Sequence, residues 1–207
     1  MPRRMADHWW WRPGWRAGRR MYTFHITFND QLDVRKLAGS CQEALRGLSG
    51  LDLVPPRWLH LTVQGVGFTD EVSVAEADAI TEAARARLAR HPVPRVTLGP
   101  VIVTPEAITL PVKPVAAITP LREELRAAIL EVWPPERLME SDTWSPHVTV
   151  AYSNDNGPAA PFRTALELAP GTADAQVRSI ELIILGRDQH AYEWTLHAAV
   201  PVGGEAG

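Results

Sequence analysis

The sequence predicts an α+β fold in which strands and helices mix and form two similar halves. Apolar residues make up 45% of the 207 positions and charged residues 22%, a globular composition that excludes a disordered chain, a coiled coil and a collagen-like repeat. Segments that alternate polar and apolar residues are followed by segments with apolar residues at helical spacing. Prolines and glycines separate these segments. The three observations indicate a packed core that uses both kinds of element.

Two strands and two helices are expected in the first half. Residues 22–28 alternate large apolar side chains with polar ones, which is typical of a strand with one buried face. Asp33 is the expected N-cap of a helix, and Ser73 with Glu76 forms a capping box that opens another. The expected elements of this half are strands at 22–28 and 58–66 and helices at 33–48 and 73–90.

Short strands separated by prolines open the second half. Thr119 and Pro120 are the expected N-cap and first residue of its long helix, which Pro134 and Pro135 end. The other expected elements are strands at 95–99, 101–104, 107–112 and 147–152, a loop at 154–161, a short helix at 162–168, and a closing hairpin of strands at 176–185 and 192–200.

The chain is predicted to consist of an N-terminal extension at 1–20, a single domain at 21–202 and a flexible tail at 203–207. The extension holds four of the eight tryptophans and six arginines against one aspartate, while the remainder carries a net charge of −8. It lacks the apolar segment and the cleavage site of a secretory signal. Its tryptophans could stack on bases while its arginines contact phosphates. We favour the alternative, in which the aromatic side chains pack on the domain surface.

Several classes of protein are excluded. No apolar run approaches the length of a membrane span, and no predicted strand is followed by a G-x-G-x-x-G or G-K-[ST] loop. The acidic body argues against capture of long nucleic acids. The single cysteine, Cys41, excludes an intramolecular disulfide and a cysteine-based zinc site, lies on an apolar helix face, and indicates a reducing compartment, the cytoplasm.

Two predicted strands carry one signature, His-x-Thr-Val: His60 with Thr62, and His147 with Thr149. Residues two apart on a strand project from the same face, so each strand presents an imidazole and a hydroxyl side by side. An imidazole with a pKa of about 6.5 can give or take a proton near neutrality. A hydroxyl can donate to an anionic oxygen without adding charge. If the strands face each other, they suit acid–base hydrolysis of a phosphodiester without a metal.

With these two motifs, the chain resembles the 2H phosphoesterase superfamily, the 2′-5′ RNA ligase and cyclic phosphodiesterase group, over residues 21–201. The resemblance implies a bilobal α+β fold: two pseudo-symmetric lobes of mostly antiparallel sheet, with flanking helices, around a central groove. It implies opening of 2′,3′-cyclic phosphates to 2′-phosphates without a metal or other cofactor, and in some members 2′-5′ RNA ligation. It also implies that His60, Thr62, His147 and Thr149 are catalytic, and it favours His60 as acid and His147 as base.

Four further residues are candidates for substrate binding. His25 belongs to a third His-x-Thr triplet, on the strand at 22–28, and is expected to form an auxiliary wall of the groove. Trp58 and Gln64 share the face of His60 and Thr62. Arg187, which follows the first strand of the closing hairpin, is a candidate for contacting phosphate. His197 and Tyr152 are interpreted as structural.

The expected partner is a nucleotide or an RNA end that carries a cyclic phosphate, without a membrane or a metal. The same groups could hydrolyse a cyclic dinucleotide or a cyclic phosphate derived from ADP-ribose. A binding module of the same fold could instead hold phosphorylated RNA ends without turnover. A metal hydrolase that uses His25, His60 and His147 is less favoured, because no carboxylate stands at ligand spacing beside them.

Overall fold

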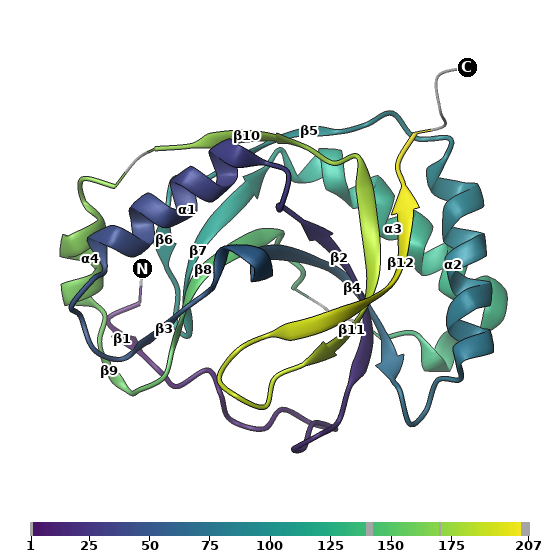
Figure 1. The fold of residues 1–207 in the computed structure, drawn as a ribbon, viewed down its shortest axis with the longest axis horizontal. Helices are drawn as coiled ribbons and strands as arrows, with labels where there is room; N and C mark the ends of the chain where they lie inside the picture. The colour runs from purple at the N-terminus through teal and green to yellow at the C-terminus, as the bar shows by residue number, and fades with distance from the viewer. Residues whose placement is uncertain (1, 140–142, 170, 204–207) are drawn as a thin grey trace.

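The chain folds into two curved antiparallel sheets with helices on their outer sides, as Figure 1 shows. This computed structural model describes residues 2–139, 143–169 and 171–203. The arrangement confirms the predicted bilobal α+β class. Among the described residues, no helix has the length and apolar character that crossing a membrane requires.

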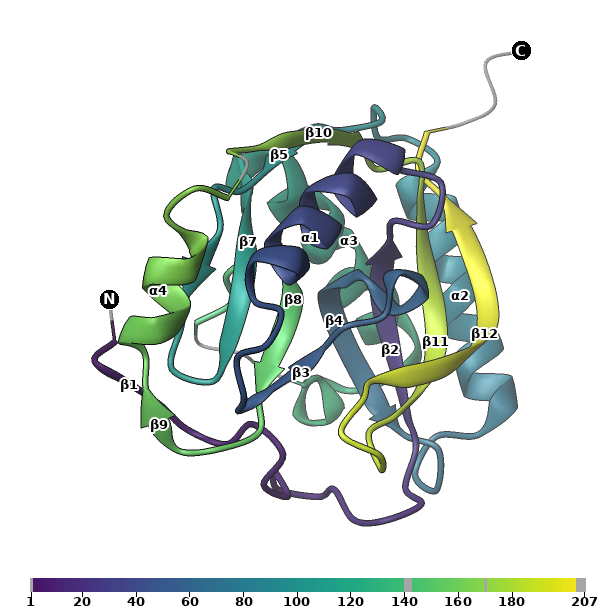
Figure 2. The same cartoon turned by 60° about the vertical axis from the view of Figure 1, so that its left-hand side comes forward.

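The first sheet has the strand order β12-β11-β2-β4, and every neighbouring pair is antiparallel. Its strands are β2 (Met21–Thr27), β4 (His60–Phe68), β11 (Ser179–Gly186) and β12 (Glu193–Pro201). The helices α2 (Val74–Leu88) and α3 (Val115–Val132) contact each other, α2 packs on β12, and α3 packs on β4. This lobe therefore keeps its helices on one face of its sheet (Figure 2).

The second sheet has the order β10-β5-β7-β8-β3, with β6 paired to β7. Its strands are β3 (Leu51–Leu53), β5 (Arg95–Leu98), β6 (Ile102–Val103), β7 (Ala107–Lys113), β8 (His147–Ser153) and β10 (Ala173–Gln176). The helix α1 (Leu32–Ala44) packs on β8 and β10, and the short helix α4 (Ala160–Leu166) contacts α1 and β6. Two 3₁₀ turns, at Pro56–Trp58 and Pro135–Arg137, complete the elements of the described residues apart from the β1–β9 pair.

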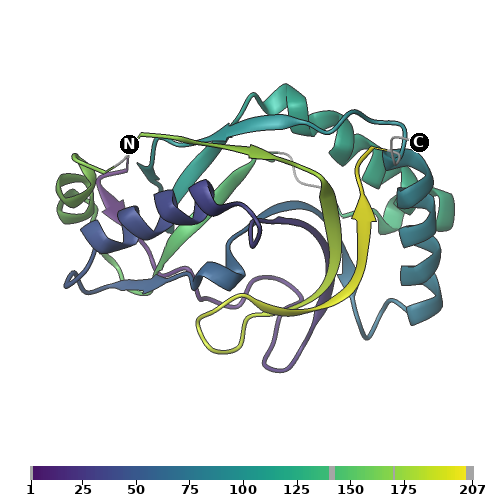
Figure 3. The same cartoon turned by 45° about the horizontal axis from the view of Figure 1, so that its top comes forward.

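The lobes do not coincide with the two halves of the sequence. The first sheet combines strands from the start and the end of the chain, whereas the second is built from its middle (Figure 3). The strand predicted at 176–185 corresponds to β11, which begins three residues later, at Ser179, whereas β10, which ends at Gln176 in the other sheet, was not predicted. At the crossing, the N–H of Val177 donates to the carbonyl of Pro94.

Three helix starts differ from the prediction, those of α1, α3 and α4, and one agrees; α4 begins at Ala160 and not at residue 162. Ser73 and Glu76 form the predicted capping box of α2. Helix α1 begins one residue before Asp33, which lies in the first turn, and its N-cap is Gln31. There a carboxylate still stabilises the helix through its interaction with the unpaired N–H groups.

The prediction that α3 starts at Thr119 is wrong, because the helix begins at Val115 and contains Pro120 in its interior. An interior proline removes one backbone hydrogen bond and is normally costly. Here the side chains of Ile118 and Leu121 are fully buried, so the extra turn brings apolar surface into the core. Thr119 is not a cap, since its hydroxyl donates to the carbonyl of Val115.

Residues 4–20 form an N-terminal strap that runs from one lobe to the other, along the lower edge of Figure 1. It starts at β1 (Arg4–Met5), which pairs with β9 (Gly157–Pro158). Met5 and Trp9 are buried in the core, and the indole N–H of Trp9 donates to Asp52 of β3 at 2.8 Å. The two neighbouring tryptophans remain about half exposed, Trp10 at 48% and Trp11 at 49%.

The arginines of the strap pair with carboxylates of the acidic body. Arg12 pairs with Glu106, next to β7 of the second sheet. Arg19 pairs with Asp70 and Glu71, which follow β4 of the first sheet. The remaining pairs of the strap are Arg16 with Asp70 and Arg20 with Asp188. The uneven charge of the sequence is thus largely balanced within the molecule.

At the other terminus, Gly203 donates its N–H to the carbonyl of Leu88 at 3.1 Å. The rest of the predicted tail, 204–207, lies outside the described residues.

Candidate active site

The two motif strands come from different sheets and contact each other at the centre of the molecule. His60 is the first residue of β4 and follows the Pro56–Trp58 turn. The strand was expected to begin at Trp58, but the prolines before it lack N–H groups and favour the 3₁₀ turn. The Nδ1–H of His60 donates to the carbonyl of Trp58 at 2.8 Å.

His147 is anchored in the same way. It is the first residue of β8, and its Nδ1–H donates to the carbonyl of Ser145 at 2.7 Å. In both motifs, therefore, the ring is fixed by the carbonyl two residues before it. A carbonyl can only accept, so the proton of each neutral ring lies on Nδ1. The Nε2 atoms carry the lone pairs, and no described residue forms a hydrogen bond with either of them.

The two histidines differ in burial. His60 is 7% exposed, whereas His147 is exposed. The pKa of His60 is lowered to about 4, chiefly by burial; the hydrogen bond to Trp58 raises this pKa, and the nearby His147 lowers it. His60 is therefore neutral across the physiological range. The effect of His147 on the pKa of His60 also indicates that the two imidazoles lie close enough to interact electrostatically.

The threonines of the two motifs also differ. Thr62 is exposed beside His60, whereas Thr149 is 5% exposed. The backbone carbonyl of Thr62 accepts the indole N–H of Trp144 at 3.1 Å.

The third His-x-Thr triplet lies beside the first on the antiparallel strand β2. The register places His25 opposite Thr62 and Thr27 opposite His60, so the histidine of one triplet meets the threonine of the other. The imidazoles of His25 and His60 are stacked, with centroids 4.3 Å apart and planes at 7°. His25 Nε2 lies 3.2 Å from Thr62 Oγ1. The hydroxyl of Thr27 donates to Glu181.

His25 does not form a wall of the groove, because its side chain is 0% exposed. The period of two along the strand correctly predicted on which face of the sheet the His25 side chain lies. Its burial, however, depends on β12, which lies in the same sheet. There the indole of Trp194 packs 5.4 Å from His25, 5.2 Å from His60 and 4.5 Å from Trp58. Trp58 is half buried within this aromatic group.

The other two candidates, Gln64 and Arg187, are buried. Gln64 is buried, and its amide N–H groups donate to the carbonyls of Met139 and Gly65. Arg187 is 3% exposed under the N-terminal strap, where one of its N–H groups donates to the carbonyl of His8. Its guanidinium lies 5.6–5.9 Å from the ring centroids of Trp9, Trp11, Trp15 and Tyr192.

A hydrogen-bonded group that sequence reasoning missed joins the strap to the site. His8 Nε2 accepts from the hydroxyl of Tyr192 at 2.9 Å, and its Nδ1–H donates to Glu106 at 3.2 Å. The ring of Tyr192 lies 6.1 Å from that of His60. Burial and the charge of Arg12 lower the pKa of His8 to about 4, so this ring is also neutral. Residues so far apart in sequence carry no common local pattern that could have grouped them.

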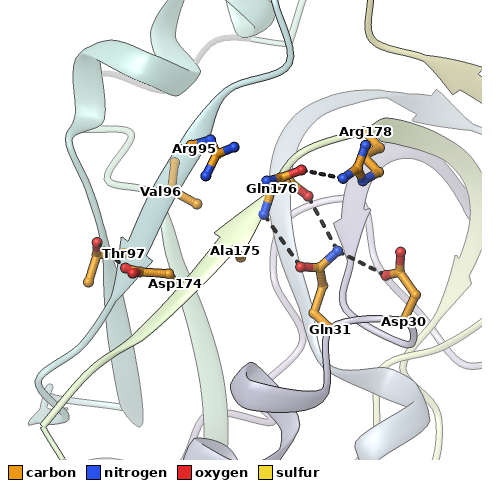
Figure 4. A pocket seen from close by; sticks show the side chains of 9 residues that line it. All are labelled: Asp30, Gln31, Arg95, Val96, Thr97, Asp174, Ala175, Gln176 and Arg178. Carbon is orange, nitrogen blue, oxygen red and sulfur yellow. Dashed lines mark hydrogen bonds between the residues drawn. The ribbon is translucent and has the colours of Figure 1, made fainter.

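A polar hollow of about 570 Å³ lies between the start of α1 and strands β5 and β10 (Figure 4). None of the His-x-Thr residues lines it. Its polar side chains largely have partners within the hollow: Thr97 bonds to Asp174, Arg178 to the side chain of Gln176, and Gln31 to the backbone N–H and carbonyl of Gln176. We therefore place the candidate active site at the motif strands and not in this hollow. Among the described residues, no group of three His, Cys, Asp or Glu side chains is arranged to hold a metal ion.

At the motif strands, two imidazoles with outward lone pairs lie beside two hydroxyl groups. One imidazole can accept a proton, and the other can deliver one once it is protonated. The hydroxyls can hold an anionic group between them.

Comparisons with known proteins show the family and the fold of the chain. The family model of the 2′-5′ RNA ligase superfamily matches residues 33–189. The structure of TT0787 of Thermus thermophilus has a TM-score of 0.68 and 23% identity, covering 90% of this chain and 99% of that one. Escherichia coli LigT in apo form has a TM-score of 0.66 and 16% identity, covering 89% and 98%. The MHV ns2 PDE domain has a TM-score of 0.54 and 12% identity, covering 81% and 99%.

These structural similarities show the shared fold. Further structures of Escherichia coli LigT are complexes with 3′-AMP, phosphate, NADP+ and ATP. A search of curated proteins gives no significant match.

Proposed function

Because the chain belongs to the 2′-5′ RNA ligase superfamily, whose members are 2H phosphoesterases, we propose that it opens a 2′,3′-cyclic phosphate to a 2′-phosphate. The substrate would be a nucleotide or an RNA end. The observation that carries the proposal is the matched anchoring of His60 and His147, which leaves two Nε2 atoms for proton transfer on neighbouring strands.

The proposed reaction is an in-line displacement at phosphorus. The base accepts a proton from water on Nε2 while the water oxygen bonds to phosphorus. The bond from phosphorus to O3′ breaks, and the acid passes its Nε2 proton to O3′. The product is a 2′-phosphate with a free 3′-hydroxyl, and exchange with solvent resets both imidazoles. Thr62 and Thr149 would donate to the non-bridging oxygens, where negative charge grows in the transition state.

We assign His60 as acid and His147 as base, following the family resemblance. In this assignment, the neutral His60 of the free protein gains its proton when the anionic phosphate binds, since a nearby negative charge favours the imidazolium. A phosphodiester with a nitrophenolate leaving group tests the assignment, because that group leaves without a proton. On this substrate, His60→Ala should lose far less activity than His147→Ala. The reverse pattern would exchange the two roles.

Binding of a nucleoside would use the aromatic residues next to His60. Trp58 and Trp194 pack beside that ring, and an indole face is a suitable surface for stacking a base. The nucleotide complexes of the structurally similar LigT support a nucleotide substrate here. With a 5′-hydroxyl of a second RNA in place of water, the same displacement at phosphorus would form a 2′-5′ linkage and leave a free 3′-hydroxyl. The buried single cysteine, Cys41, supports the proposal of a reducing, cytoplasmic location.

The test is turnover of the four nucleoside 2′,3′-cyclic phosphates with an excess of chelator, with the position of the product phosphate read by ³¹P NMR. We expect nucleoside 2′-phosphates, and no product from His147→Ala. A 3′-phosphate product would contradict the assigned bond cleavage. Binding without turnover would favour a module that holds RNA ends, and loss of turnover in chelator would favour a metal hydrolase.

A further inference from the structure

We propose that His25 is a positioning residue, which holds the oxygen of Thr62 so that the hydroxyl proton of this threonine points to the phosphate. The inference rests on the proposed function and deepens it. It gives a role to the third His-x-Thr triplet, which the two-motif mechanism does not use.

The geometry ties His25 to both members of the first motif. It lies opposite Thr62 in the β2–β4 register, and its Nε2 is within hydrogen-bond distance of Thr62 Oγ1, at 3.2 Å. Its ring is stacked on His60. A fully buried imidazole, packed between that ring and Trp194, has little freedom to rotate. The position of Nε2 against the threonine oxygen is therefore fixed by packing.

The second ring nitrogen decides which atom donates. Nδ1 of His25 is buried and has no hydrogen-bond partner among the residues that the structure describes. If Nε2 accepted the proton of Thr62, Nδ1 would carry a buried N–H with nothing to receive it. Orphaned buried N–H donors are rarer than unsatisfied acceptors. The imidazolium form is excluded, because burial lowers the pKa of His25 well below its usual value. The favourable arrangement has Nε2–H donating to Thr62 Oγ1 and a bare lone pair on Nδ1.

This arrangement determines what Thr62 can do. Its oxygen is occupied as an acceptor from His25, so its own O–H must find another acceptor. The side chain is exposed beside His60, where a non-bridging phosphate oxygen would lie in the proposed reaction. In the second lobe the residue opposite Thr149 on β7 is Thr109, and the hydroxyl of Thr149 shares a side-chain hydrogen bond with Tyr152 and not with a histidine. The two lobes are thus chemically unequal at their threonines.

Histidine-detected ¹⁵N NMR of the full-length chain tests the proton position without any substrate. We expect the Nε2–H tautomer of His25 at neutral pH. The Nδ1–H tautomer would overturn the proposal, whatever the protein hydrolyses. This arm therefore keeps the inference testable even if the cyclic phosphate activity is not found.

A double-mutant cycle tests the function of the contact. Thr62→Val should lower kcat about 10²-fold, the usual loss for one transition-state donor, and His25→Phe should lower it about 10-fold. In the Thr62→Val background, His25→Phe should change kcat less than about 2-fold, because the hydroxyl it positions is already gone. Independent, multiplying losses would mean that His25 acts only as packing and would overturn the proposal.

The matched control is His197→Phe. His197 lies on β12 of the same sheet and bonds to Asp78 of α2 on the helix-covered side, so this change removes a comparable hydrogen bond away from the site. We expect His197→Phe to lower the melting temperature and leave kcat unchanged. If His25→Phe affects kcat no more than this control does, the positioning role is refuted.

Discussion

His60 and His147 are held by the same hydrogen bond, from Nδ1–H to the carbonyl two residues back, although they lie on strands of different sheets. The shared bond fixes the tautomer of both rings and leaves both Nε2 atoms as proton acceptors in the neutral state. Their surroundings differ, since one ring is buried and the other is exposed. The consequences of this pairing can be measured.

Replacement of either histidine should disable the reaction without unfolding the chain. We expect His60→Ala and His147→Ala each to lower kcat by about 10²–10⁴-fold, the usual contribution of a positioned acid or base. His147→Ala should keep the wild-type melting temperature, because that side chain is exposed. Steady-state kinetics and thermal unfolding of the same preparations check both points. Near-native turnover by either variant would contradict the proposed pair.

The pH profile should report the burial of His60. Because its pKa is lowered to about 4, the acidic limb of kcat/KM should lie near pH 4 instead of near 6.5, whichever histidine is the acid. Trp194→Ala admits water to the ring and should move this limb upward. Trp10→Ala, a change on the half-exposed part of the strap, should leave the limb in place. If the acidic limb of the wild-type kcat/KM profile lies between pH 6 and 7, His60 is not desolvated in the working enzyme.

Acid should destabilise the fold through its buried neutral histidines. The pKa of His8 is about 4 in the folded chain and about 6.5 when unfolded, so the unfolded state binds more protons between these pH values. The free energy of unfolding keeps its full value above pH 6.5. As the pH falls toward 4, the protonation of His8 in the unfolded state lowers it by on the order of 3 kcal/mol. Urea unfolding at several pH values measures the slope. In His8→Asn the slope should be shallower, and an equal slope would exclude His8 as a source.

Two neighbouring tryptophans of the strap should behave differently. Trp9→Ala removes a buried indole that bonds to Asp52, and should cost about 3–5 kcal/mol of unfolding free energy. Trp10→Ala should cost little, because that side chain is half exposed. Binding of an RNA oligomer, measured in parallel, should not depend on Trp10 if the strap is structural. Selective loss of oligomer binding in Trp10→Ala, with unchanged stability, would support the base-stacking alternative.

Local signals in the sequence predicted local structure well. The capping box at Ser73 and the strands of both motifs follow from short patterns of a few residues. The start of α3 was wrong because the burial of Ile118 and Leu121 outweighs the local preference of Pro120 for a first turn. A local pattern cannot reveal the stabilisation gained by burying these two side chains, because their burial depends on elements elsewhere in the chain.

The sequence predicted groups of neighbouring site residues only where all members of a group lie on one strand. The pairs His60 with Thr62 and His147 with Thr149 follow from a period of two. The burial of His25 does not, since it requires the sheet order that brings Trp194 of β12 over it. Arg187 was expected at phosphate and lies instead under the strap, because the sequence does not reveal where residues 4–20 pack.

The strap also bears on the order in which the chain can fold. Its residues are synthesised before every one of their partners, and the pairs of Arg20 with Asp188 and His8 with Tyr192 span 168 and 184 positions. The first sheet has the same property, since β2 lies between β4 and β11. Such long-range contacts make folding slow and leave apolar surface exposed in the meantime. A nascent chain that lacks β11 and β12 would have Trp9 and His25 without their coverings, so the active site can form only after nearly the whole sequence has been made.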